Sequence, residues 1–125
     1  MADYKPFGVE YTPLHKRAKV VDGKAYVCKV GEIAVGKAKA IDLGKFRVAV
    51  FNIDGEYLAV KDACPHAEYP LSKGMVDGKA VTCASHNWKF NLKSGECLRG
   101  EKGLFIRTFE VILDGDDIWV KVKVS

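Results

Sequence analysis

Residues 64–66 read Cys-Pro-His and residues 83–86 read Cys-Ala-Ser-His, with sixteen residues between the two runs. Each run offers one thiolate and one imidazole in the same order, but a single turn cannot enclose a metal centre. A second turn must therefore meet the first from another part of the chain. The intervening segment is long enough for strand, turn and strand, and Gly74, Asp77 and Gly78 are residues that turns favour. The sequence predicts a metal site built from Cys64, His66, Cys83 and His86.

Two mixed pairs of Cys and His suit a centre that gives sulfur ligands to one metal atom and nitrogen ligands to another. A Rieske [2Fe-2S] centre has this division, with two Cys on one iron and two His on the other. A structural zinc site could use the same four residues, since Cys2His2 is a common tetrahedral set. Zinc ligands, however, are usually grouped as Cys-x-x-Cys and His-x-x-x-His. The pattern therefore favours the iron–sulfur centre over zinc, over mononuclear iron and over four residues packed without metal.

Outside the ligand runs the chain reads as mostly β. Residues 45–53 and 56–61 are rich in β-branched and aromatic side chains and flank Asp54-Gly55, a strong hairpin signal. Residues 107–113 and 118–124 flank a second turn at 114–117. In residues 118–124, aliphatic side chains alternate with Trp119 and two lysines, which predicts one buried face and one solvent-exposed face.

Shorter strands are predicted at 25–30 and 37–43, and within the ligand segment at 80–83, 87–92 and 96–99. No segment shows a convincing helical period with caps. We therefore expect a β base with a smaller cluster-bearing lobe inserted at about residues 62–103. Residues 1–23 are predicted to be an N-terminal arm and residues 24–124 the domain itself.

The bulk composition bounds the class of protein. With 125 residues, 48% hydrophobic and 29% charged, the chain is expected to be one ordinary globular domain. It has no apolar run of about 18 residues and no leader-like N-terminus, so we expect no membrane association and a cytoplasmic location. Cys28 and Cys97 are expected to be free, buried thiols. The net charge of +4 comes from scattered lysines, which disfavours nucleic acid and suits an acidic protein partner.

The segment from Cys64-Pro65-His66 through Cys83-Ala84-Ser85-His86-Asn87-Trp88-Lys89-Phe90 resembles a Rieske-type ferredoxin. It is particularly similar to the ferredoxin components of aromatic-ring oxygenase systems. The resemblance is sharpest over about residues 60–96 and diffuse over about 24–124. It implies an all-β Rieske-like fold of three antiparallel sheets, with one [2Fe-2S] cluster per chain at the tip of two loops. Cys64 and Cys83 would bind one iron, and His66 and His86 the other.

Three departures from relatives refine this expectation. The quinol-oxidising Rieske proteins carry an extra, disulfide-linked Cys in each ligand loop, and this chain has none at those positions. They also place a Ser and a Tyr where this chain has Trp88 and Phe90. Losing those hydroxyl donors should lower the reduction potential and disfavours quinol oxidation. The third loop, residues 98–104, lacks the proline that relatives usually have, which leaves open how that side of the cluster is shielded.

The resemblance implies a one-electron carrier with no substrate chemistry of its own. It would accept electrons from a flavin-containing reductase and pass them to a terminal oxygenase, and we expect a monomer. One alternative is the small Rieske-like subunit of an assimilatory nitrite reductase. Another is a zinc-stabilised interaction module, which a visible spectrum would separate from an iron–sulfur protein.

Overall fold

The computed structural model describes residues 17–65, 69–85 and 87–122, and these form three antiparallel four-stranded sheets. The outer sheet has the order β1-β2-β12-β11, from Val20–Val21, Lys24–Lys29, Asp117–Lys121 and Val111–Asp114. The middle sheet has the order β10-β5-β4-β3, from Thr108–Phe109, Glu56–Lys61, Arg47–Ile53 and Ala38–Asp42. The third sheet runs β6-β7-β8-β9, from Met75–Asp77, Ala80–Thr82, Lys89–Asn91 and Cys97–Arg99. The all-β, three-sheet prediction is confirmed.

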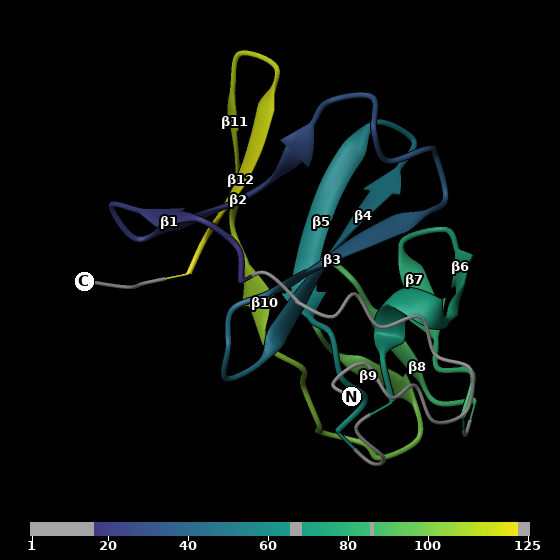
Figure 1. The fold of residues 1–125 in the computed structure, drawn as a ribbon. Coiled ribbons are helices and arrows are strands. Elements are labelled where there is room, and N and C mark those ends of the chain that lie inside the picture. Colours follow the sequence, from purple (N-terminus) through teal and green to yellow (C-terminus); the bar gives the residue numbers. More distant parts are fainter. Residues whose placement is uncertain (1–16, 66–68, 86, 123–125) are drawn as a thin grey trace, which may run out of the picture.

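The middle sheet separates two hydrophobic cores, and β4 serves both. Six consecutive β4 residues, from Val48 to Ile53, are buried, as expected for a strand covered on both faces. Val48 and Val50 belong to the core shared with the outer sheet. Ala49 and Phe51 belong to the core shared with the β6–β9 lobe. Figure 1 shows this lobe and the outer sheet on opposite sides of β3, β4 and β5.

Tight turns place the hairpins where the sequence predicts them. Asp54 and Gly55 have φ angles of 53° and 93°, the left-handed pair that a two-residue hairpin turn requires. They bring Ile53 opposite Glu56. The segment between the two ligand runs folds as strand, turn and strand, with Asp77 opposite Ala80 across the β6–β7 hairpin. This hairpin confirms the interpretation of the sixteen-residue gap.

One predicted strand is divided between two sheets. The sequence predicts segment 107–113 as one arm of a hairpin, but Thr108–Phe109 pair with β5 in the middle sheet as β10. Only Val111–Asp114 pair with β12. The Phe109 ring stacks on Phe46, with centroids 5.9 Å apart. The change of sheet at Glu110 links the outer sheet to the middle one, and the alternation of side chains does not reveal it.

The last strand behaves as its pattern predicts over the part that is described. Ile118 and Val120 are fully buried, Trp119 is half-buried and Lys121 is exposed. At the other end, Val20–Val21 within the predicted arm pair with β2, while residues 1–16 lie outside the described part. Among the described residues, no helix is long and apolar enough to cross a membrane.

Candidate metal centre

Two turns, one after β5 and one after β7, carry the predicted cysteine ligands. Cys64 and Cys83 are both fully buried and belong to the same apolar cluster, together with Leu71, Val81 and Phe90. Backbone hydrogen bonds close both turns. The Cys64 N–H donates to the Tyr69 carbonyl at 2.8 Å, and the Cys83 N–H donates to the Trp88 carbonyl at 2.7 Å. The fold therefore brings the two turns to one core.

A buried carboxylate anchors the base of the first ligand turn. Asp62 is 3% exposed, and its carboxylate accepts hydrogen bonds from the Ser72 N–H at 2.6 Å and the Ser72 hydroxyl at 2.8 Å. The Arg47 guanidinium lies 3.9 Å from the same carboxylate. Because buried charges are costly without such partners, this set fixes the chain just before Cys64. Sequence reasoning missed Asp62, since nothing in the motif marks it.

The second ligand turn needs a left-handed residue directly after His86. Asn87 has φ of 62°, a conformation that Asn tolerates better than most residues. Its N–H donates to the Cys83 carbonyl at 2.9 Å, and its carbonyl accepts a hydrogen bond from Arg99 Nε at 2.9 Å. Arg99, at the end of β9, therefore ties the third loop to the second ligand turn.

The third loop packs its backbone against Trp88. Gly100 has φ of 137°, and a Cβ added there would lie 2.4–2.8 Å from three atoms of the indole ring. Only glycine allows so close an approach of backbone to ring. Trp88 is itself packed against the core that contains Cys64 and Cys83, the two predicted ligands. In this loop without proline, the Gly100 backbone therefore packs directly against Trp88.

The two remaining cysteines lie outside the two turns, Cys97 in the core that contains Cys64 and Cys83, and Cys28 in the other core. Cys28 and Cys97 are buried free thiols, and no disulfide joins any of the four cysteines, all of which lie in the described ranges. Burial, followed by the nearby Glu32 charge, raises the pKa of the Cys28 thiol. The Cys97 thiol lies 3.4 Å from the Arg99 carbonyl. Both residues therefore act as small core side chains, as predicted.

The described residues fit the cysteine half of the predicted centre. Two fully buried cysteines, not joined to each other, begin paired turns in one apolar core. Thiolate ligands in such a site suit an iron–sulfur cluster. The predicted histidine ligands, His66 and His86, lie outside the described residues. Within the described ranges no group of three or more His, Cys, Asp or Glu gathers to hold a metal ion.

The Rieske [2Fe-2S] domain family matches residues 15–110 of the sequence. The chain belongs to this family. The ferredoxin component of biphenyl 2,3-dioxygenase from Rhodococcus jostii (strain RHA1) is 33% identical over 97 residues, which cover 78% of this chain and 91% of that protein. The 3-phenylpropionate/cinnamic acid dioxygenase ferredoxin subunit of Escherichia coli (strain K12) is 33% identical over 98 residues, 78% of this chain and 92% of that one.

Solved structures of Rieske proteins share the fold. The ferredoxin of carbazole 1,9a-dioxygenase from Nocardioides aromaticivorans IC177 aligns with a TM-score of 0.75 at 24% identity, over 82% of this chain and all of that chain. A putative NADPH nitrite reductase small subunit aligns with a TM-score of 0.67 at 26% identity, over 78% of this chain and 96% of that one. The expectation of a Rieske-type ferredoxin fold is therefore confirmed, and a Rieske-type [2Fe-2S] cluster is the cofactor of this family.

Proposed function

We propose that this protein is a one-electron carrier of an oxygenase system, with Cys64, His66, Cys83 and His86 as the cluster ligands. The observation that carries the proposal is the burial of two cysteines, each on a hydrogen-bonded turn, in one apolar core. The curated relatives at 33% identity, which are ferredoxin components of dioxygenases, support the carrier role. When bound, the cluster takes up and releases one electron.

The chain's own residues hold and insulate the site. The Cys64 and Cys83 side chains are sealed in a core of Leu71, Val81 and Phe90, which excludes water from the sulfur side. Asp62 and Arg99 hold the two turns through the hydrogen bonds described above. Trp88 and Phe90 offer no hydroxyl donors there, which favours a potential toward the low end of the Rieske range.

The proposal includes the partners on either side of the carrier. A flavin-containing reductase would supply electrons, and a terminal oxygenase would accept them. The names of the dioxygenase ferredoxin components support the second step. We further propose one cluster per chain in a monomeric, cytoplasmic protein without enzymatic activity of its own.

The likeness to the nitrite reductase small subunit at 26% identity supports a second candidate function, a subunit of such an enzyme. Stable co-purification with a large catalytic subunit would favour that candidate.

Cysteine variants of the purified protein test the ligand assignment. Cys64→Ser and Cys83→Ser should abolish the red-brown visible absorption and the electron paramagnetic resonance signal of the dithionite-reduced protein. Cys97→Ser is the matched control, because Cys97 is also buried in the same core, and it should retain both signals. Iron and acid-labile sulfide should be present in equal amounts. A colourless zinc protein, or loss of the signals in Cys97→Ser alone, would contradict the proposal.

A further inference from the structure

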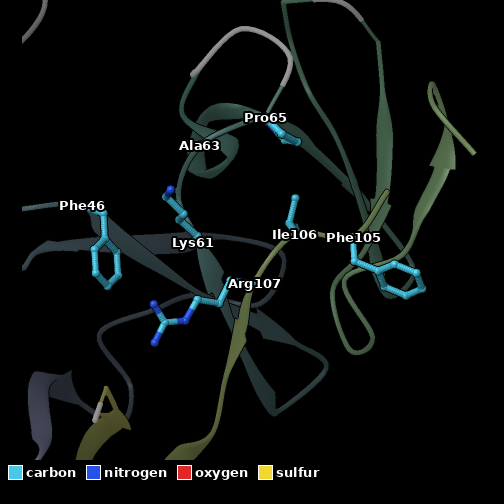
Figure 2. Close-up of a pocket in the computed structure, with 7 residues that line it drawn as sticks. All are labelled: Phe46, Lys61, Ala63, Pro65, Phe105, Ile106 and Arg107. Carbon is cyan, nitrogen blue, oxygen red and sulfur yellow. The ribbon is translucent and has the colours of Figure 1, made fainter. Parts of the chain in front are cut away.

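A surface hollow of about 250 Å³ lies at the base of the first ligand turn. It is lined by Phe46, Lys61, Ala63, Pro65, Phe105, Ile106 and Arg107. Ala63 and Pro65 flank Cys64 in the chain, so the hollow begins where the first ligand turn begins. Figure 2 shows Lys61 and Arg107 extending toward the side of Phe46, while the Phe105 ring points the other way. We call this feature the Phe46 hollow.

The Phe46 hollow is lined, among the described residues, by two cations and no carboxylate. Within the described ranges, neither Lys61 nor Arg107 has an Asp or Glu within ion-pair distance, although five other cation–carboxylate pairs form there. An adjoining hollow shares Phe46, Lys61 and Ala63 and adds the cations Lys45 and Arg47. Lys61 and Arg107 therefore lack a carboxylate partner within the described ranges, whereas Arg47 is paired with Asp62.

The two carboxylates of the adjoining hollow are already engaged. Asp42 accepts a hydrogen bond from the Gly44 N–H at 2.7 Å, which fixes the β3–β4 turn. The Asp62 side chain is fully buried and directed to Ser72, with Arg47 beside it. Because neither carboxylate pairs with Lys61 or Arg107, an incoming anion meets little competition at the Phe46 hollow.

Aromatic rings hold the cations in place. The Arg107 guanidinium lies 4.7 Å from the Phe109 ring centroid and 5.4 Å from that of Phe46. The Lys61 ammonium lies 6.0 Å from the Phe46 centroid. A guanidinium stacked in this way loses less conformational freedom on binding, and it still presents donors for a carboxylate. The Phe46 hollow is thus organised for an anion before any partner arrives.

We propose that the Phe46 hollow is a docking surface for an acidic segment of a redox partner protein, with a partner carboxylate seated between Lys61 and Arg107. The inference rests on the proposed carrier function. A partner docked here contacts Ala63 and Pro65, the chain neighbours of the proposed ligand Cys64. Docking by charge also accelerates encounter with an acidic partner.

A protein fits this surface better than a nucleic acid does. Arg and exposed aromatic side chains are enriched in protein interfaces, and Phe105 at the rim is 59% exposed. Nucleic-acid sites instead follow a backbone with a stripe of cations and stacking rings. Here the Phe46 and Phe109 rings are occupied by each other and by Arg107, so neither is open to a base.

The test uses the cluster-loaded protein and a fluorescein-labelled hexaglutamate peptide, with binding followed by fluorescence anisotropy at low ionic strength. Arg107→Glu and Lys61→Glu should each weaken binding about tenfold, and Arg107→Gln by less, because close charges across an interface are worth that much when salt is low. Lys39→Glu is the matched control, since Lys39 is exposed on β3 and lines neither hollow. It should change binding by less than about twofold.

Three results would overturn the proposal. They are equal weakening by Arg107→Glu and Lys39→Glu, absence of peptide binding by the unmodified protein, and tighter binding of an oligothymidylate that displaces the peptide. The visible and paramagnetic spectra of each variant are recorded in parallel. A missing [2Fe-2S] spectrum would defeat the proposed carrier function, while the peptide measurement reports on the docking surface alone.

Discussion

Substitution of Gly100 by alanine is expected to loosen the second ligand turn. The new Cβ would lie 2.4 Å from Trp88 Cδ2, 2.7 Å from Cγ and 2.8 Å from Cε3, so the ring or the loop must move. Because the Trp88 carbonyl accepts the hydrogen bond from Cys83, a displaced Trp88 disturbs a predicted ligand directly. The perturbation should therefore appear both in stability and in retention of the cluster.

Two contributions set the expected loss of unfolding free energy in Gly100→Ala. Forcing alanine to a positive φ costs about 1–3 kcal/mol, and overpacking the Trp88 contact adds about 1–3 kcal/mol. Gly103→Ala is the matched control, because Gly103 has φ of 86° in the same loop, but a methyl group added there would meet no described atom within 4 Å. Gly103→Ala should therefore lose only the stability that the positive φ costs, without the overpacking contribution. At about 4 °C per kcal/mol for a domain of this size, the difference between the two variants is about 4–12 °C in apparent Tm.

The assay is thermal unfolding of the cluster-loaded protein, together with the rate at which the visible absorption bleaches at a fixed temperature. Gly100→Ala should bleach faster than Gly103→Ala. A double variant with Trp88→Leu should recover part of the loss, since the smaller side chain relieves the overlap. Equal midpoints and equal bleaching rates for Gly100→Ala and Gly103→Ala would refute the reasoning.

Three further substitutions test the surrounding contacts. Asp62→Asn should cost about 1–3 kcal/mol of unfolding free energy in urea titrations, because the charged acceptor for Ser72 is lost; an unchanged urea midpoint would contradict this. Asn87→Val should cost about 1–3 kcal/mol through its φ of 62°, whereas Asn87→Gly should be tolerated, and equal stability of the two would argue against strain. The hydrogen bond from Lys29 lowers the pKa of Asp117. The stability from this pair is therefore present above the ordinary pKa of about 4 and lost as the pH falls through the lowered value. Lys29→Met should reduce the drop in Tm on acidification, and an identical acid profile would count against the pair.

The parts of the fold that the sequence predicts are those with local signals. Asp54-Gly55 between two β-rich segments specifies the β4–β5 hairpin, because the left-handed turn is encoded by the two residues themselves. Strand β5 is found at the predicted residues 56–61. The spacing also predicts the β6–β7 hairpin between Cys64 and Cys83, since the gap between them has room for one hairpin.

The parts that the sequence does not reveal depend on contacts between distant residues. The division of segment 107–113 at Glu110 is decided by pairing with β5 and by the Phe46–Phe109 stack. Asp62 gains its role from Ser72, ten residues away, and no motif joins the two. The approach of Gly100 to Trp88 likewise depends on the folded position of the third loop. All three features depend on tertiary contacts, which local sequence propensity does not encode.

Strand β4 links the two hydrophobic cores. Its side chains enter alternately the core shared with the outer sheet and the core shared with the β6–β9 lobe, so we expect the two cores to unfold together. Weakening the core beside the outer sheet, for example at Val48 or Val50, is therefore expected to shorten the lifetime of a cluster held by the proposed ligands. The rate at which the visible absorption bleaches would then report on unfolding of the whole domain. A substitution in the core beside the outer sheet should raise this rate without changing any predicted ligand.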